Sequence, residues 1–233
     1  MTSIKSSRLL LSFIKDLYKN EKYLNGDMDN NYELTRRACQ NLIDRLNISF
    51  NVSGVDNIPN ENSLIASNHI SFFDIIALVS SIDKSIPFAA AKELMNYPIL
   101  KNYISSIECV LIDRETDNLK VMKEQLKNME DTIKNKGLIL FPEGECSYGE
   151  FEGLRKFKKG GFISVNKNDI QIVPTYIRYK DIYKMGKWIL PIEEIDVTFG
   201  EPFRPSQITD KKIKTEELAQ YTQKKVLELR NNN

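Results

Sequence analysis

Apolar and polar residues follow two different rhythms along this chain. Near the N-terminus, apolar residues recur every three or four positions, the spacing of one face of a helix. This pattern predicts a first helix over residues 8–24 and a second over residues 32–46. The apolar side of the first helix consists of Leu10, Phe13, Ile14, Leu17 and Tyr18. Residues 26–31 between the two helices have the composition of a loop.

From residue 48 onward, short apolar runs alternate with helical segments. Strands are predicted over residues 63–67, 87–91, 109–112, 138–141, 170–178 and 195–199. Helices are predicted over residues 71–81, 117–136 and 161–168, and from Thr215 onward. Such alternation favours an α/β fold. We therefore expect a single α/β domain with a mostly parallel central sheet flanked by helices, preceded by an N-terminal helical pair. The helical segment would span residues 1–47 and the domain residues 48–233.

Composition narrows the class of protein. The net charge of +1 provides no field that would hold nucleic acid, so we expect no nucleic-acid partner. No apolar run approaches the ~20 residues of a membrane-spanning helix, so any contact with a bilayer should be at its surface. Cys39, Cys109 and Cys146 have spacings that suit neither a metal cluster nor a disulfide framework. Free thiols favour a reducing cytoplasm.

The single histidine of the chain, His69, lies in the run N-H-I-S-F-F-D over residues 68–74. It follows a predicted strand, at the end where open α/β sheets bind their ligands. Neutral imidazole can take a proton from a hydroxyl near pH 7. Asp74, five residues later, can accept a hydrogen bond from the other ring nitrogen and fix the tautomer. Ser71 and Asp74 also fit a capping box, in which Asp74 only closes the start of the helix.

Arg114 stands at the end of a second predicted strand, in the run V-L-I-D-R over residues 110–114. A guanidinium there can bind a phosphate through two hydrogen bonds. The alternative is a surface ion pair with Asp113 or Glu115.

Two further segments carry candidate chemistry. The run F-P-E-G-E-C-S over residues 141–147 also follows a predicted strand, although taken alone it is typical of a turn. The run R-K-F-K-K-G-G over residues 155–161 places four positive charges before a predicted helix. It can bind phosphate or form a solvated charged face.

Together these segments resemble one family, the lysophosphatidic acid acyltransferases, or glycerolipid acyltransferases with a His-x4-Asp signature. The matching blocks are N-H-I-S-F-F-D (68–74), I-D-R (112–114), F-P-E-G (141–144) and I-V-P-T (172–175). Shorter likenesses are K-E-L (92–94) and F-K-K-G (157–160). The blocks occur in the order of the family and cover roughly residues 50–205.

The resemblance implies that a fatty acyl group moves from acyl-CoA or acyl-carrier protein to the free hydroxyl of a lysophosphatidic acid-like glycerolipid, in phospholipid biosynthesis. His69 would be the general base and Asp74 its orienting partner. The residues implied to bind or shape the acceptor and its phosphate are Arg114, Lys92, Glu143, Gly144 and Lys158. No metal and no bound cofactor is implied, because the thioester donor already carries the activation.

One departure from the family pattern concerns the acceptor. The usual continuation after F-P-E-G is T-R-S, whereas this chain has Glu145, Cys146 and Ser147. A negative charge beside a phosphate is unfavourable. Either Lys156 and Lys158 supply the missing positive charge, or the acceptor is a lysolipid other than lysophosphatidic acid.

Lipid substrates also imply a membrane surface as a partner. We expect a cytoplasmic protein, peripheral on the cytoplasmic face of the membrane. One candidate contact is the apolar side of the N-terminal helix. Another is the stretch Tyr176 to Trp188, where aromatic residues, including Tyr179 and Tyr183, interleave with cations. The alternative is that both segments pack into the core.

Two other functions fit the same residues. A non-catalytic lipid-binding or lipid-transfer module would use the basic patch and an apolar groove without needing His69 or Asp74. A hydrolase or thiol transacylase would use Cys146, activated by His69, to form a covalent acyl-enzyme. The resemblance favours direct transfer, because the family does not use the position of Cys146 as a nucleophile.

Overall fold

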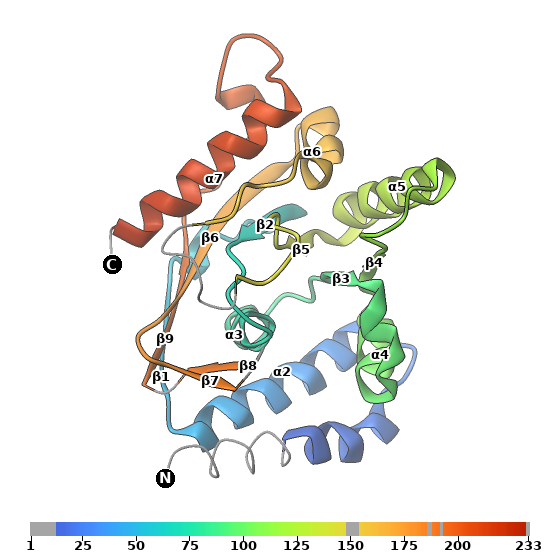
Figure 1. Ribbon diagram of the computed structural model, residues 1–233, viewed down its shortest axis with the longest axis vertical. Coiled ribbons are helices and arrows are strands. Elements are labelled where there is room, and N and C mark those ends of the chain that lie inside the picture. Colours follow the sequence, from blue (N-terminus) through green and yellow to red (C-terminus); the bar gives the residue numbers. More distant parts are fainter. Residues whose placement is uncertain (1–12, 148–153, 186–187, 192, 232–233) are drawn as a thin grey trace.

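A five-stranded sheet forms the centre of the protein in the computed structural model, which describes residues 13–147, 154–185, 188–191 and 193–231 (Figure 1). Its strands, in spatial order, are β1 (Ser49–Ser53), β9 (Glu194–Phe199), β6 (Gln171–Tyr179), β2 (Ser63–Ser67) and β5 (Leu138–Leu140). All neighbouring pairs are parallel except β6 and β9. The predicted α/β fold with a mostly parallel sheet is thus confirmed.

A parallel pair of strands extends this layer beyond β5. The pair is β3 (Ala89–Ala91) and β4 (Val110–Ile112), and a bridge between Phe88 and Ile139 links it to β5. As a result, the residues that follow β2, β4 and β5 leave the sheet at the same edge, the edge where parallel α/β sheets place their ligands.

Helices cover both faces of the sheet (Figure 1). They are α2 (Met28–Leu46), α3 (Phe73–Ser81), α4 (Pro98–Ser106), α5 (Leu119–Lys136), α6 (Ile163–Asn168) and α7 (Thr215–Asn231), with residues 13–20 also helical. Short 3-10 helices are η1 (Glu21–Tyr23), η2 (Val55–Asn57), η3 (Lys92–Asn96), η4 (Lys159–Phe162) and η5 (Pro205–Gln207). Alternate residues of β2 face opposite sides: Ile65 packs with α2 and α3, whereas Leu64 and Ala66 pack with α5, α6 and α7.

Local signals explain where two of the helices begin and end. Asp27 caps α2, since its carboxylate accepts hydrogen bonds from the backbone N–H groups of Asp29 and Asn30 at 2.9 and 3.2 Å. The prediction of a loop through residue 31 was therefore wrong, and α2 begins at Met28. Gly137 ends α5 as predicted, with φ +76°, and a Cβ there would lie 2.9 Å from the carbonyl oxygen of Ser63.

Several elements were not predicted from the sequence. They are β1, α4 and a hairpin of β7 (Ile182–Met185) and β8 (Trp188–Pro191). β1 is short and has only two apolar residues, Phe50 and Val52, which are partly buried and alternate with exposed residues. The helix α4 begins with Pro98, which is favourable only in a first helical turn.

The N-terminal helix packs on the core, which corrects the prediction that its whole apolar side meets a membrane. Phe13 and Leu17 are buried among residues of α2 and α3, and the hydroxyl of Tyr103 donates a hydrogen bond to the carbonyl oxygen of Leu17 at 2.8 Å. Ile14 remains 41% exposed, and Leu10 lies outside the described residues. No helix in the described part of the chain is both long and apolar enough to cross a bilayer.

Candidate active site

His69 leaves the sheet at the end of β2, and its neighbour Asn68 fixes that exit. The side-chain amide of Asn68 donates to the carbonyl oxygen of Ile177 on β6 at 2.9 Å, and its oxygen accepts from the N–H of the same residue at 2.7 Å. These two hydrogen bonds replace the backbone pairing between β2 and β6 at the point where the chain leaves the sheet. The histidine is therefore held against the sheet by a buried polar contact.

Asp74 joins the histidine to the start of α3. One carboxylate oxygen, Oδ2, lies 2.7 Å from Nδ1 of His69. The same oxygen accepts the backbone N–H groups of Ile70 and Ser71 at 2.6 and 2.9 Å. The two interpretations of the sequence are therefore compatible, because Asp74 stabilises the loop before α3 and orients the imidazole at once.

The other oxygen of Asp74 has a partner that sequence reasoning did not identify. The hydroxyl of Tyr179, at the end of β6, donates to Oδ1 of Asp74. Burial raises the pKa of Tyr179, and the charge of Asp74 and this hydrogen bond raise it further, so the hydroxyl remains a donor. Tyr179, a candidate for membrane contact, is instead partly buried against the core, and its hydroxyl contacts Asp74. The side chains of Tyr183 and Trp188 lie outside the described part of the structure.

The segment after β5 packs directly against His69. Phe141 stacks on the imidazole, with ring centres 4.1 Å apart and an interplanar angle of 14°. Glu143 is only 2% exposed, and its two oxygens accept the backbone N–H groups of His69 at 2.7 Å and Arg155 at 2.9 Å. Burial raises the pKa of Glu143, although these two hydrogen bonds oppose the rise. Both oxygens are occupied, so Glu143 shapes the site by positioning the backbone.

Cys146 lies on the ring nitrogen opposite Asp74. Its Sγ is 3.0 Å from Nε2 of His69, and the side chain of His69 is 14% exposed. Burial by itself lowers the pKa of His69, but the hydrogen bonds and charges of Asp74 and Cys146 outweigh burial and raise that pKa above its ordinary value. The imidazole is thus held between a carboxylate and a thiol, an arrangement suited to moving one proton.

Two predicted phosphate ligands meet at Gly144. Arg114 donates from Nη1 to the carbonyl oxygen of Gly144 at 2.8 Å and pairs with Glu93 at 3.6 Å. The predicted alternative of an ion pair with Asp113 or Glu115 is not what the structure shows for Arg114. Gly144 has φ +79°, and a Cβ on it would lie 2.7 Å from Nζ of Lys158. A larger residue would therefore displace Lys158 as well as strain the turn.

The remaining basic residues have partners of their own. Lys92 pairs with Asp113 at 3.3 Å, so its ammonium lies next to the strand end that carries Arg114. Arg155 pairs with Glu145 at 2.7 Å, which offsets the negative charge that departs from the family pattern. Lys156 pairs with Glu216 of α7 at 3.1 Å. Of the two lysines expected to replace the missing charge, Lys158 is the one placed beside Gly144.

Comparison with known proteins identifies the family of this chain. The family model described as Acyltransferase matches residues 49–178, a stretch that contains both His69 and Asp74. The chain belongs to this acyltransferase family. Among relatives of the acyltransferase is the 1-acyl-sn-glycerol-3-phosphate acyltransferase of Saccharomyces cerevisiae, 29% identical over 133 residues, covering 57% of this chain and 44% of the yeast protein. A probable enzyme of the same name from Mycoplasma pneumoniae is 30% identical over 128 residues, covering 52% of this chain and 46% of the relative.

A crystal structure supports the fold of the acyltransferase over nearly its whole length. The 1-acyl-sn-glycerophosphate acyltransferase of Thermotoga maritima has a TM-score of 0.71 with it and 21% sequence identity, covering 97% of this chain and 98% of that one. At this identity the likeness establishes the fold alone. The matched part spans less than half the length of the yeast and Mycoplasma relatives.

Proposed function

We propose that this acyltransferase moves a fatty acyl group from a thioester donor, acyl-CoA or acyl-carrier protein, to the free hydroxyl of a lysophosphatidic acid-like glycerolipid. The observation that carries the proposal is the contact of 2.7 Å between Nδ1 of His69 and Oδ2 of Asp74. With Nδ1 committed to the carboxylate, only Nε2 is left to take a proton. Asp74 stabilises the positive charge that the ring acquires when it does so.

The acceptor phosphate has a binding place beside this base. Arg114 and Lys158 both lie at Gly144, within the segment that packs against His69. A guanidinium and an ammonium close to the same turn residue suit a phosphate monoester. Lys92 and Arg114 follow the paired strands β3 and β4, so Lys92 can add a third charge. Glu145 is held by Arg155 and so does not exclude a phosphate.

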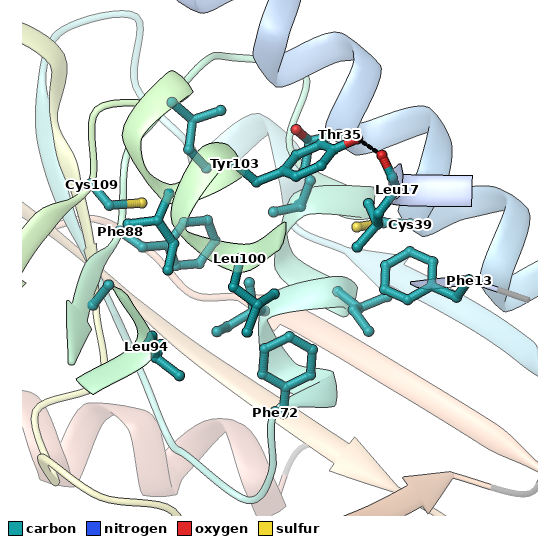
Figure 2. A pocket seen from close by; sticks show the side chains of 16 residues that line it. Phe13, Leu17, Thr35, Cys39, Phe72, Phe88, Leu94, Leu100, Tyr103 and Cys109 are labelled. Atoms are coloured by element: carbon teal, nitrogen blue, oxygen red, sulfur yellow. Dashed lines mark hydrogen bonds between the residues drawn. The ribbon is translucent and has the colours of Figure 1, made fainter. Parts of the chain in front are cut away.

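An apolar cavity suits the hydrocarbon part of a substrate (Figure 2). It lies among α2, α3, α4 and the N-terminal helix, and apolar side chains provide most of its wall, including Phe13, Phe72 and Leu100. Phe88 lines the cavity and stacks on Phe141, the ring that covers His69. An acyl chain in the cavity would therefore end close to the base. Contact with the membrane surface, where such lipids reside, and action on its cytoplasmic face belong to the same proposal.

Transfer assays with a His69→Ala variant test the proposed function. Purified protein receives labelled acyl-CoA or acyl-carrier protein together with a panel of lysophospholipids. We expect His69→Ala to lower transfer by roughly 10²- to 10⁴-fold while the protein remains folded, with a lower melting temperature because Asp74 loses a buried donor. The control is Lys224→Ala, an exposed side chain of α7 outside the site. A folded His69→Ala protein with normal turnover would contradict the mechanism. Lysolipid binding by a wild-type protein that transfers nothing would favour the lipid-binding module instead.

A further inference from the structure

The three cysteines lie in contrasting surroundings. Cys39 and Cys109 line the apolar cavity, and burial raises the pKa of each thiol to about 12. Thiols in such places are inert, since the reactive form is the thiolate. Cys146 is partly exposed, and its sulfur lies 3.0 Å from Nε2 of His69. Of the three cysteines, all within the described residues, Cys146 is the one in contact with a base.

Hydrogen bonds between His69 and residues on both sides of Cys146 hold this contact in place. The N–H of Ser147 donates to the carbonyl oxygen of His69 at 2.8 Å. On the other side, Glu143 accepts the N–H of His69 at 2.7 Å. His69 is thus tied to the residue after Cys146 and to one shortly before it. The path of the main chain therefore places Sγ of Cys146 next to the imidazole of His69.

The position of the sulfur has a consequence for the reaction. Nε2 is the nitrogen that must take a proton, and the thiol of Cys146 lies 3.0 Å from it. Cys146, His69 and Asp74 form a row of nucleophile, base and orienting carboxylate, with contacts of 3.0 and 2.7 Å. We propose that Cys146 carries the acyl group as a thioester between donor and acceptor, which makes the transfer a two-step reaction. This inference rests on the proposed acyl transfer and adds an intermediate to it.

Each half-reaction balances in atoms and charge. In the first, Sγ of Cys146 attacks the donor carbonyl carbon while His69 takes the thiol proton. The bond from that carbon to the donor sulfur breaks, and the donor thiol leaves with the proton from His69. In the second, His69 takes the proton of the acceptor hydroxyl, whose oxygen attacks the new thioester. The carbon–sulfur bond to Cys146 breaks, and the thiol recovers the proton.

Incubation with donor alone tests this inference. Wild-type protein receives a radiolabelled long-chain acyl group, separately as the CoA and the acyl-carrier-protein thioester, and is quenched in acid. We expect one acyl group per chain, bound to Cys146, labile to neutral hydroxylamine, and passed to lysophosphatidic acid at least as fast as steady-state turnover. Cys146→Ala should form no adduct and lose roughly 10²- to 10⁶-fold in turnover. Cys146→Ser should accumulate a hydroxylamine-resistant ester, and Lys224→Ala, the exposed control on α7 outside the site, should still acquire the adduct at Cys146.

Other results would overturn the intermediate without touching the proposed function. A Cys146→Ala protein that transfers at the wild-type rate, together with a wild-type protein that yields no adduct, means direct attack by the acceptor. His69→Ala would then still abolish transfer. An adduct that forms but passes to the acceptor more slowly than turnover would also overturn the inference. If wild-type protein transfers from neither donor and forms no adduct, the proposed function fails along with it.

Discussion

At the start of α3 both oxygens of Asp74 are held inside the protein, whereas around Gly144 the charged groups sit at the surface. Asp74 is completely buried and receives the hydroxyl of Tyr179 on one oxygen and three nitrogens on the other. Arg114 is 43% exposed and forms an ion pair with Glu93, whose side chain is 47% exposed. Exposed ion pairs contribute only ~0–1 kcal/mol, so Arg114 can exchange Glu93 for a ligand at little cost. The first region therefore fixes the base, and the second can adapt to a phosphate.

Removing the charge of Asp74 should give the largest effect of the predictions that follow. Asp74→Asn keeps one oxygen for the loop N–H groups but loses the carboxylate that supports an imidazolium. We expect turnover to fall roughly 10²- to 10⁴-fold, with a modest loss of stability. Asp74→Ala also removes the cap, which adds a stability loss of about 0.5–2 kcal/mol. If Asp74→Asn lowers the melting temperature but leaves turnover per folded molecule unchanged, Asp74 only stabilises the start of α3 and does not support the base.

The same variant predicts a shift in pH dependence. Asp74 helps to raise the pKa of His69, so its neutralisation should lower that pKa. A general base must be unprotonated, which means that activity rises as pH passes upward through the pKa of His69. The acid limb of kcat/KM should therefore move to lower pH in Asp74→Asn than in the wild type. If the acid limb of kcat/KM moves to higher pH in Asp74→Asn, a group other than His69 determines it.

Arg114→Ala tests the second region. A hydrogen bond to a charged group contributes about 1.5–3 kcal/mol, so we expect the KM for the phosphorylated acceptor to rise roughly 10- to 100-fold. The KM for the donor and the melting temperature should change little, because Arg114 is exposed. Arg114→Lys, the conservative control, keeps the charge but loses the paired donors. Its KM for the acceptor should lie between those of the wild type and Arg114→Ala. A rise confined to the donor KM would place Arg114 at the donor instead.

Tyr179→Phe sharpens the comparison, because it removes one donor from the buried network and leaves the charge of Asp74 intact. A buried carboxylate oxygen without its donor costs about 1.5–3 kcal/mol, and the orientation of Asp74 toward His69 then depends on the contacts of Oδ2 alone. We expect stability to fall by about that amount and kcat by about tenfold, with the acceptor KM unchanged. Since Tyr179 acts through Asp74, Tyr179→Phe combined with Asp74→Asn should cost little more activity than Asp74→Asn alone. Additive losses would show that Tyr179 has a separate role.

These residues show how far the sequence could lead. The pairing of His69 with Asp74 was predictable, because His69 follows β2 closely and Asp74 stands five residues later, in the first turn of α3. Tyr179 was not, because it stands 105 positions from Asp74 and reaches it only through the register of β2 with β6, in which Ser67 pairs with Thr175. An aromatic residue among lysines carries the same local pattern whether it faces lipid or a buried carboxylate.

The N-terminal helix shows a second limit. Its apolar spacing was predicted correctly, but spacing does not say what the apolar side meets. In the structure Phe13 and Leu17 pack on α2 and α3. By contrast, the start of α2 at Met28 had a local signal in Asp27, which the acidic, asparagine-rich composition of the segment concealed.

The smallest expected effect concerns the membrane. Within the described part of the N-terminal helix, Ile14 is 41% and Tyr18 70% exposed. Full burial of an Ile side chain contributes about 1.5–3 kcal/mol, and partial insertion at an interface contributes less. The double variant Ile14→Ser, Tyr18→Ser should therefore bind anionic vesicles several-fold more weakly in co-sedimentation, with an unchanged melting temperature. The control is Val55→Ser, which removes an equally exposed apolar residue from η2. Equal losses for both would mean that general surface hydrophobicity determines binding. No loss for the double variant, with binding still sensitive to salt, would shift the membrane contact to basic residues elsewhere.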